Sequence, residues 1–358
     1  MKKRVLVLSK YPRMGASSRL RTLQYLPLLE QQGFEFTVRS LFDEKYLEKL
    51  YADGSRSRLA VSKYYSKRLL TLFSLWRYDL VWIEKEIFPY LPAFSEQFLA
   101  LIGKKYIVDY DDAIFHNYDL SRNKPIQILL ANKIDKVMKH SSHVIAGNHY
   151  LAARAKSAGA KNIQLIPTVV DHLRYEQCKV RTDGVLTVGW IGSPSTQKYI
   201  IEILPALLMV YRQLPFRLVL VGATQDISED LPGLDVVVHS WDEKTEADLI
   251  GTMDIGIMPL HDSPWEKGKC GYKLIQYMAC GVPIIASAIG VNVEIVKNTK
   301  SGLLVDSSLS WQDALLKMLV SPNLRIQFGI AGRQAVEKQY SVESQLPVIG
   351  RVLNSSVK

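Results

Sequence analysis

Residues 262–287, DSPWEKGKCGYKLIQYMACGVPIIAS, contain the clearest structural pattern of the chain. An apolar run at 254–260 precedes it, another at 282–286 ends it, and both are typical of buried strands. Between them, residues 271–280 place apolar side chains on one side of a helix, which a Gly-Val-Pro sequence ends. The stretch therefore predicts a strand–loop–helix–strand unit. Its helix should begin at the carboxyl end of a parallel sheet, where free N–H groups and the helix dipole favour an anion.

Three polar side chains of this stretch follow the spacing of one helix face, because Lys269, Lys273 and Gln276 stand at i, i+4 and i+7. Two positive charges at a helix start oppose the helix dipole, and a bound phosphate or diphosphate would remove that conflict. The alternative is that both lysines are solvated surface residues. We expect a diphosphate site here, with Gly271 and Tyr272 at the start of the helix.

The segment YMACGVPIIAS, residues 277–287, resembles the donor-binding motif of GT4-type glycosyltransferases, which have the GT-B fold. That family usually has two glutamates, eight positions apart, before this segment, and here Gly268 and Gln276 stand in their places. A subgroup of GT4-like proteins has a K-x-G-x-K loop, which residues 269–273 resemble. The resemblance implies that Gln276 lies at the nucleotide ribose, with hydrogen bonds in place of the family's charge.

The length and composition fit a soluble globular protein with two domains. The chain has 358 residues, of which 47% are apolar and 22% charged. Its three cysteines, Cys178, Cys270 and Cys280, show no paired spacing, which indicates reduced thiols and a cytoplasmic location. The first apolar run is too short for a signal peptide, and no run reaches the ~18 apolar residues of a membrane span.

The net charge of +10 is unevenly distributed along the chain. Residues 1–175 contain 28 Lys and Arg against 16 Asp and Glu, or +12, whereas residues 176–358 contain 17 against 19, or −2. We therefore expect the N-terminal half to face something acidic, such as an anionic membrane, a phosphorylated lipid or a nucleic acid. Solubility alone would not explain the asymmetry.

The N-terminal half opens with a strand at 4–9, a helix at 19–31 and a strand at 34–40, as a doubly wound fold should. The first strand-to-helix turn contains small residues, which allow close backbone approach, and arginines, which bind phosphate or carboxylate with two hydrogen bonds. The sequence GASSRLR there resembles the N-terminal loop of GT-B enzymes, which faces the cleft. The resemblance implies an acceptor or cleft loop made of Gly15, Ser17, Ser18, Arg19 and Arg21.

Residues 56–78, RSRLAVSKYYSKRLLTLFSLWRY, are basic and aromatic. Leu69, Leu72, Phe73 and Trp76 repeat at helical spacing, with Lys63, Lys67 and Arg68 nearby. Such a helix could lie on an anionic bilayer. It could also be an ordinary helix packed on the sheet, and the two interpretations are compatible.

Acidic residues follow the strand expected at 106–110. Asp109, Asp111 and Asp112 are crowded there, and like charges raise one another's pKa, an arrangement more common at sites than on plain surfaces. D-x-D is also a metal motif of GT-A glycosyltransferases, but the cationic loop at 269–273 already supplies charge where a metal would sit. DYDDAIF resembles the DxDD segment of the GT4-like subgroup. The resemblance implies that Asp111 and Asp112 orient acceptor hydroxyls, without a metal.

The remaining predicted site residues follow other strands. GNHYL after the strand at 144–146 resembles a family turn and adds Asn148, and a polar link at 171–183 ends the N-terminal domain. In the second domain the strands at 184–191, 217–222 and 235–240 should lead to donor-binding residues, which are Gly192, Ser193, Lys198, Gly222, Trp241 and Glu243. The resemblance implies that Lys198 takes the place of a diphosphate-binding lysine, although Tyr199 replaces the glycine that follows it.

Together these features predict an α/β protein of the GT-B class, with two Rossmann-like doubly wound domains facing a central cleft. The resemblance implies that residues 1–175 form the acceptor domain and residues 184–340 bind the nucleotide-sugar, and that the helix at 341–358 packs back on the first domain. Lys269, with Asp111 and Asp112, is the predicted catalytic set. Lys269, Lys273 and the helix start at Gly271 would stabilise the leaving diphosphate.

The resemblance implies a retaining, metal-independent glycosyltransferase of hexosyltransferase type. It would transfer a sugar from a UDP- or GDP-linked donor to a lipid-linked or polysaccharide acceptor in cell-surface glycan assembly, such as lipopolysaccharide O-antigen or capsule. No cofactor or nucleic-acid partner is expected. The protein would be cytoplasmic and peripheral on the inner face of the cytoplasmic membrane. The alternatives are a GT-B nucleotide-sugar epimerase and a non-catalytic protein that binds anions or nucleic acid.

Overall fold

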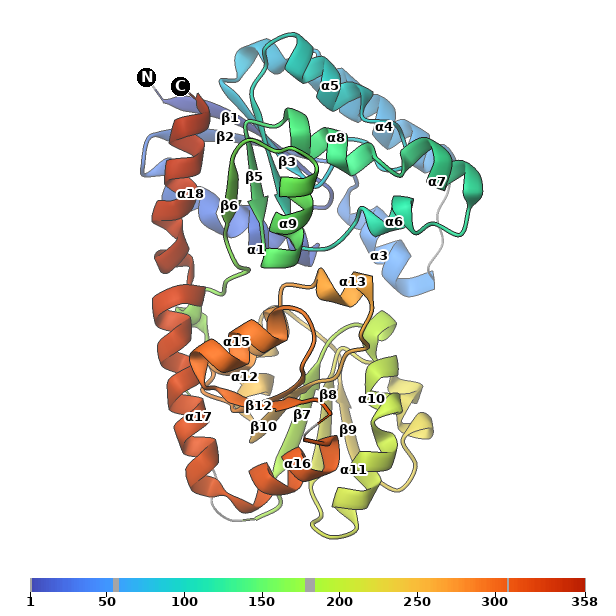
Figure 1. The fold of residues 1–358 in the computed structure, drawn as a ribbon, viewed down its shortest axis with the longest axis vertical. Coiled ribbons are helices and arrows are strands. Elements are labelled where there is room, and N and C mark those ends of the chain that lie inside the picture. The colour runs from blue at the N-terminus through green and yellow to red at the C-terminus, as the bar shows by residue number, and fades with distance from the viewer. Residues whose placement is uncertain (1, 54–57, 178–183, 308, 358) are drawn as a thin grey trace. The chain divides into compact units, whose positions relative to one another are not determined.

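The computed structural model describes residues 2–53, 58–177, 184–307 and 309–357, and the chain divides into two units (Figure 1). The N-terminal unit contains Met1–Thr168, Gly268–Cys270 and Gln345–Lys358; the C-terminal unit contains Val169–Lys267 and Gly271–Ser344. The division thus falls at residue 168, whereas the sequence predicts a link at 171–183. Cys178 and the rest of that link to residue 183 lie outside the described residues.

The described part of the N-terminal unit contains a parallel sheet with the strand order β2-β1-β3-β4-β5-β6. Its central strands are apolar along their length because helices cover both faces, as is usual for parallel sheets (Figure 1). The strands agree with the predicted ones to within a few residues. Their bounds are β1 Lys3–Ser9, β2 Phe34–Ser40, β3 Leu80–Glu84, β4 Tyr106–Tyr110, β5 His143–Ala146 and β6 Ile163–Leu165.

The first predicted helix, at 19–31, is interrupted in the structure. Thr22 leaves the helical region of backbone space, with φ −128°, so the segment forms α1, a 3₁₀ turn and α2. The predicted helix at 56–78 is α4, and residues 56 and 57 lie outside the described part. The helices of this unit are α1 Ala16–Arg21, α2 Leu26–Glu30, α3 Glu44–Asp53, α4 Arg58–Leu72, α5 Phe94–Leu101, α6 His116–Asp119, α7 Lys124–Leu130, α8 Lys133–His140 and α9 His149–Ser157.

The described part of the C-terminal unit contains a second parallel sheet, with the order β12-β11-β10-β7-β8-β9. Strand β7 lies centrally between β10 and β8, so the strand order reverses beside it. Ligands of open α/β sheets bind at such a point. The bounds are β7 Thr187–Ile191, β8 Arg217–Val221, β9 Asp235–His239, β10 Ile255–Met258, β11 Ile284–Ser287 and β12 Gly302–Val305.

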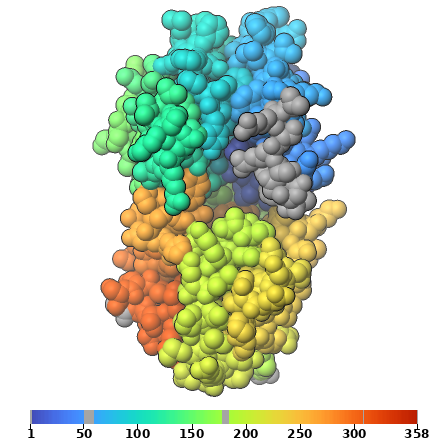
Figure 2. All heavy atoms as spheres, turned by 90° about the vertical axis from the view of Figure 1, so that its right-hand side faces the viewer, coloured from blue at the N-terminus to red at the C-terminus, as the bar shows by residue number. Residues whose placement is uncertain are grey.

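Helices cover both faces of this second sheet. In Figure 2 the residues of α10 and α11, in yellow-green, form the middle of the visible face of the unit, beside the yellow residues that follow β8. Helix α11 packs against α16, and α14 packs against α17. The bounds are α10 Lys198–Glu202, α11 Leu204–Tyr211, α12 Glu246–Gly251, α13 Pro264–Lys267, α14 Tyr272–Ala279, α15 Val291–Thr299, α16 Trp311–Val320 and α17 Pro322–Ala335.

The helix within residues 262–287 begins later than the spacing of Lys269 and Lys273 suggests. Gly271 precedes α14 with φ +65°, in the left-handed region, and the helix runs from Tyr272. Lys269 therefore does not lie on the helix, and the prediction that it shares one helix face with Lys273 and Gln276 is wrong. A left-handed residue turns the chain, and that turn separates the two lysines.

The chain ends in α18, Val342–Val357, which follows a π-helical turn at Val336–Tyr340. Its residues from Gln345 belong to the N-terminal unit. There Ser356 Oγ lies 2.8 Å from His143 Nδ1, and Lys3 donates a hydrogen bond to Asn354. The helix thus joins the amino ends of β1 and β5. Over the described residues, no helix is both long and apolar enough to cross a membrane.

Candidate active site

Glycines allow the backbone to come close at the carboxyl edge of the C-terminal sheet. A Cβ on Gly192, directly after β7, would lie 2.2 Å from the Trp190 ring and 2.6 Å from Lys273 Nζ. A Cβ on Gly222, directly after β8, would lie 2.3 Å from the Gly192 carbonyl oxygen, and its φ of +81° already disfavours other residues. The edge is therefore built from bare backbone, as a loop that approaches a phosphate requires.

Lys273 brings a positive charge to this edge from the first turn of α14. Its Nζ lies 4.3 Å from the centroid of the buried Trp190 ring and donates a 3.4 Å hydrogen bond to Thr196 Oγ1. Ser193 and Thr196 form a capping box at the 3₁₀ turn that follows Gly192. The predicted donor residues Gly192, Ser193, Gly222 and Lys273 are thus gathered around one loop. Such an arrangement suits an anion.

Lys198, also predicted to bind diphosphate, has an exposed side chain whose Nζ lies 5.1 Å from the centroid of the Tyr199 ring. Tyr199 stands where the sequence resemblance predicts a glycine. Its hydroxyl donates to the buried carboxylate of Glu266, which also accepts from Ser263. The tyrosine therefore has a structural partner of its own, a role that the sequence pattern did not suggest.

Gln276 is buried in a hydrogen-bond network of the C-terminal unit. Its amide donates to the Tyr175 hydroxyl over 3.3 Å, and that hydroxyl donates to Glu246 over 3.1 Å. Trp241 Nε1 donates to the same carboxylate over 2.7 Å. The structure thus brings together two predicted residues, Gln276 and Trp241, through Tyr175 and Glu246, which the sequence reasoning missed.

Glu243, another predicted donor-binding residue, accepts from Arg174 Nη1 over 3.3 Å. Tyr272, at the start of α14, forms a hydrogen bond with the Tyr175 hydroxyl. Burial raises the pKa of Tyr175, and Tyr272 adds to this shift. Tyr272, Gln276 and Trp241 thus belong to one polar group around Tyr175 and Glu246, whereas Glu243 is paired with Arg174.

In the N-terminal unit the loop after β1 binds the ends of the neighbouring strands. Ser18 Oγ donates to Glu84 Oε2 over 2.6 Å, and the Lys10 N–H donates to the same oxygen over 2.9 Å. Arg21 forms a buried ion pair with Asp109, with 2.9 Å between Nε and Oδ1, and donates to the Ile166 carbonyl. Of the predicted loop, Ser18 and Arg21 are thus bonded within the protein.

Arg19 and Gly15 belong to the same loop. Both are buried, and Arg19 Nη1 donates to the Arg13 carbonyl over 3.3 Å. A Cβ on Gly15 would lie 2.5 Å from Tyr11 Cβ, so the loop folds closely on itself. The hydrogen bond to the Arg13 carbonyl thus directs the Arg19 guanidinium into the loop.

Lys85 lies among the predicted acidic residues, although the sequence reasoning did not identify it. Its Nζ is 2.8 Å from Asp111 Oδ1, 3.5 Å from Asp112 Oδ2 and 3.1 Å from Ser17 Oγ. Its φ is +65°, which costs a non-glycine residue of order 1–3 kcal/mol and often marks a functional site. Only its place directly after β3, beside two glutamates, could have suggested it.

The three aspartates after β4 differ in their ionisation. Burial raises the pKa of Asp109 to about 6, although the Arg21 guanidinium opposes the shift. Burial also disfavours ionised Asp111, but Lys85 and Arg21 outweigh it and hold the pKa of Asp111 below its usual value. For Asp112, burial together with Asp111 outweighs Lys85 and Lys269, and the pKa is raised. Neighbouring carboxylates shifted in opposite directions are typical of acid–base sites.

The segment Gly268–Cys270 joins this acidic group. Asn148 caps α9, and its Nδ2 donates to the carbonyls of Gly268 and Lys269 over 3.0 and 2.9 Å. A Cβ on Gly268 would lie 2.4 Å from Ala113 Cβ, so this position, where the resemblance predicts a glutamate, has no room for a side chain. The Lys269 charge acts on Asp112, which places this lysine with the predicted acceptor residues.

In the described part of the chain, no three His, Cys, Asp or Glu side chains are grouped so that they could hold a metal ion. The described thiols, Cys270 and Cys280, are buried and not joined in a disulfide, and burial raises the pKa of Cys270.

Comparison with known proteins identifies a family match in the C-terminal unit. Residues 182–321 match the sequence family described as Glycosyl transferases group 1, which includes the loop after β7, β8 and the whole of α14. No curated protein matches the chain.

Solved structures resemble the whole chain. Sucrose-phosphate synthase from Thermosynechococcus elongatus has a TM-score of 0.72 at 16% identity, covering 99% of both chains. Anabaena Alr3699/HepE, in complex with UDP and glucose, has a TM-score of 0.66 at 16% identity, covering 99% of this chain and 100% of that one. WaaG, a glycosyltransferase involved in lipopolysaccharide biosynthesis, has a TM-score of 0.67 at 14% identity, covering 97% of this chain and 99% of that one. At these identities the likeness is one of fold. The chain therefore has the two-domain α/β fold of GT-B glycosyltransferases, and its residues 182–321 match the group 1 glycosyl transferases.

Proposed function

We propose that this protein is a GT4-like, retaining glycosyltransferase of the subgroup with a K-x-G-x-K loop. It transfers a sugar from a UDP- or GDP-linked donor to a lipid-linked or polysaccharide acceptor in cell-surface glycan assembly. The observation that supports this most is the glycine-lined edge with Lys273, within the segment that matches group 1 glycosyl transferases. The UDP complex of one structural neighbour and the lipopolysaccharide role of another support the donor and the acceptor class.

The C-terminal unit binds the donor in this proposal. The diphosphate lies at the loop after β7 and the start of α14, where Lys273 and backbone N–H groups face the negative charge that grows as the sugar leaves. Such fixed donors lower the barrier without a metal, because they need no reorganisation during the reaction. Trp241 and the Tyr175 network position the base and ribose, with Gln276 acting through Tyr175.

The N-terminal unit acts on the acceptor in this proposal. Asp111, held ionised by Lys85, orients a hydroxyl, and Asp112, whose pKa is raised, accepts its hydrogen bond and shares its proton. Lys269 tunes Asp112 and remains a catalytic candidate beside it. The protein works at the inner face of the cytoplasmic membrane as a peripheral protein, with anionic lipids and not nucleic acid as the partner of its basic half.

The test is product analysis with a donor panel. The full chain is incubated with UDP- and GDP-linked hexoses and a lipid-linked acceptor fraction, and mass spectrometry follows the acceptor. A hexose increment with one donor, lost in Asp112→Asn and in Lys273→Met, supports the proposal. A sugar-nucleotide that changes into its isomer, with no increment on any acceptor, would establish the epimerase alternative. Neither product, together with binding of nucleic acid, would establish the non-catalytic one.

A further inference from the structure

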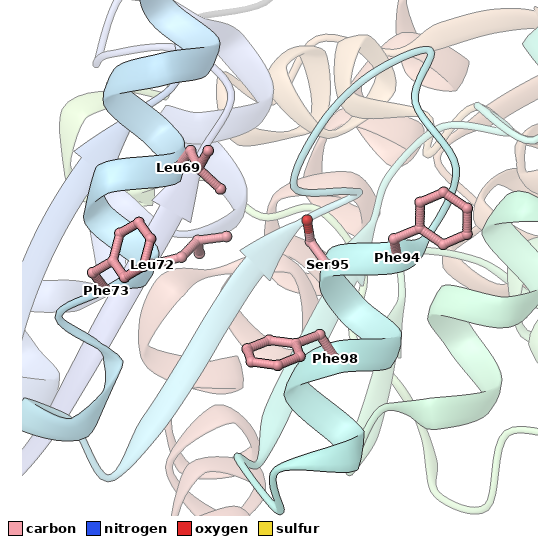
Figure 3. Close-up of a pocket in the computed structure, with 6 residues that line it drawn as sticks. All are labelled: Leu69, Leu72, Phe73, Phe94, Ser95 and Phe98. Carbon is pink, nitrogen blue, oxygen red and sulfur yellow. The ribbon is translucent and has the colours of Figure 1, made fainter.

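Helices α4 and α5 of the N-terminal unit lie side by side and leave an apolar hollow between them (Figures 1 and 3). The hollow has a volume of about 250 Å³. Figure 3 shows Leu69 and Leu72 of α4 on one side of the hollow and Phe98 of α5, whose ring points toward α4, on the other. The lining residues are Leu69, Leu72, Phe73, Phe94, Ser95 and Phe98. Apart from one serine, the lining therefore offers hydrocarbon alone to whatever enters.

The apolar surface extends well beyond the hollow. Phe73 and Trp76 are 74% and 75% exposed, and on the other side Phe94 and Leu101 are 72% and 83% exposed. A helix packed on the sheet in the ordinary way would bury this stripe. Large apolar surfaces of this kind on a soluble unit mark interaction sites. The sequence pattern showed the stripe of α4, whereas the matching face of α5 becomes apparent only in the structure.

Several exposed cations border this surface. Residues 56–78 contain no Asp or Glu, and Lys63, Lys67 and Arg77 are exposed. Lys105, shortly after α5, is also exposed. The acid of α5, Glu96, is buried and accepts the Ile87 N–H over 2.8 Å. An apolar face bordered by positive charge is complementary to an anionic bilayer, and a second copy would bring the same cations together.

Arg68 was expected among the exposed cations and is not one of them. It is 3% exposed, and its Nη2 donates to the carbonyls of Ser9 and Arg39. This arginine fastens α4 to the ends of β1 and β2, which holds the opposite face of the helix outward. A test of membrane binding must therefore leave it intact.

We propose that α4 and α5 insert their apolar face into the hydrocarbon region of an anionic bilayer, and that the hollow receives a lipid hydrocarbon chain. This deepens the membrane part of the proposed function, because it identifies the contact as apolar insertion that the surrounding cations assist. The lysines select the anionic surface, and the aromatic side chains supply affinity that salt does not screen.

The experiment measures co-sedimentation of the full chain with vesicles of phosphatidylcholine, alone or with 30 mol% phosphatidylglycerol, at about 0.1 M and 1 M salt. We expect the double variant Phe73→Ser/Phe98→Ser to weaken binding about tenfold or more under all conditions, since two large exposed apolar groups are lost. Lys63→Glu/Lys105→Glu should weaken binding only to anionic vesicles at low salt. Ile330→Ser, at an exposed apolar residue of α17, is the matched control and should bind as wild type.

A second readout locates the contact. Phospholipids brominated on their acyl chains should quench tryptophan fluorescence, and Trp76→Phe should remove most of that quenching without abolishing sedimentation. Wild-type binding by Phe73→Ser/Phe98→Ser, absence of quenching, or loss of all binding at 1 M salt would overturn insertion. Self-association that depends on Phe73 and Phe98 would overturn it in favour of a second copy. Nucleotide binding, measured in solution without vesicles, should be unchanged in these variants, so failure here is distinct from failure of the proposed transferase activity.

Discussion

The carboxyl edges of the two sheets have opposite chemistry. In the N-terminal unit charged side chains fill the edge and are bonded to one another, as Arg21 is to Asp109 and Lys85 is to Asp111. In the C-terminal unit the equivalent edge consists mainly of glycine backbone, with Lys273 above Trp190. The same strand-to-helix architecture thus produces a charge-compensated edge in one unit and a backbone-lined edge in the other.

This difference indicates which edge suits which ligand. An edge whose charges are already paired gains little from a highly charged diphosphate, but its oriented carboxylates can hold hydroxyl groups. A bare backbone edge with a positive side chain and a helix start can surround a diphosphate closely. The contrast supports donor binding by the C-terminal unit and acceptor binding by the N-terminal unit.

The largest expected effect is on the charge-compensated edge. Lys85→Met should lower the stability of the N-terminal unit by about 3–5 kcal/mol, because it leaves the largely buried Asp111 without its cation. Amide hydrogen exchange in β4 measures this loss. Adding Asp111→Asn should recover part of it, and Lys105→Met, at an exposed lysine, should stay within about 0.5 kcal/mol of wild type. An unaltered exchange rate in Lys85→Met would show that the ion pairs do not matter.

Next in size is the backbone edge. Gly222→Ala should destabilise the C-terminal unit by roughly 2–4 kcal/mol, since the methyl group meets the Gly192 carbonyl at a positive φ. Gly33→Ala has a positive φ but nothing within 4 Å, and should cost only about 1 kcal/mol. Urea unfolding with a probe in each unit separates the two. Equal costs would mean that close approach is not a special property of the edge after β8.

A smaller effect distinguishes the cations around that edge. Lys273→Met should weaken UDP or GDP binding by about 1.5–3 kcal/mol, the range for a hydrogen bond to a charged group. Uridine or guanosine should be little affected. Lys198→Met and Lys269→Met should each cost less, because one side chain is exposed beside Tyr199 and the other belongs to the N-terminal unit. Calorimetric titration of each variant with UDP or GDP is the measurement. A larger loss of affinity in Lys269→Met than in Lys273→Met would show that the diphosphate binds at Lys269 instead.

The smallest effect concerns Gln276. Gln276→Ala should cost about 0.5–1.5 kcal/mol of stability, the value of one hydrogen bond, through loss of the contact to Tyr175. Gln276→Glu should be worse at neutral pH, because it places a second carboxylate beside the buried Glu246. Acidification should relieve that variant, since a protonated Glu can donate to Tyr175. Thermal unfolding between pH 5 and 8 is the measurement, and a pH-independent Gln276→Glu variant would contradict it.

Much of the fold could be predicted from apolar runs, because buried parallel strands need them on both faces. Strand β4, for example, was predicted at its observed bounds, and the small residues after β1 correctly indicated a strand-to-helix turn. The interruption at Thr22 was missed, because the apolar spacing of residues 19–31 continues across it.

The sites were harder to predict because the sequence does not show which way a charged side chain points. Arg68 resembles its exposed neighbours Lys63 and Lys67 in the sequence. It is nevertheless buried, and it donates to the backbone carbonyls of Ser9 and Arg39, which lie far away in the chain. Lys269 has helical spacing relative to Lys273, and only the left-handed Gly271 separates them. Lys85 and Glu246 become site residues through partners far away in sequence, which are Asp111 for Lys85 and Tyr175 for Glu246.

The most direct test of the difference between the two edges is amide hydrogen exchange of the full chain with and without UDP. We predict protection at residues 192–196, 222–224 and 271–274, and little change at residues 15–21. Protection of residues 15–21 without any at 192–196 would contradict the assignment of the donor to the C-terminal unit.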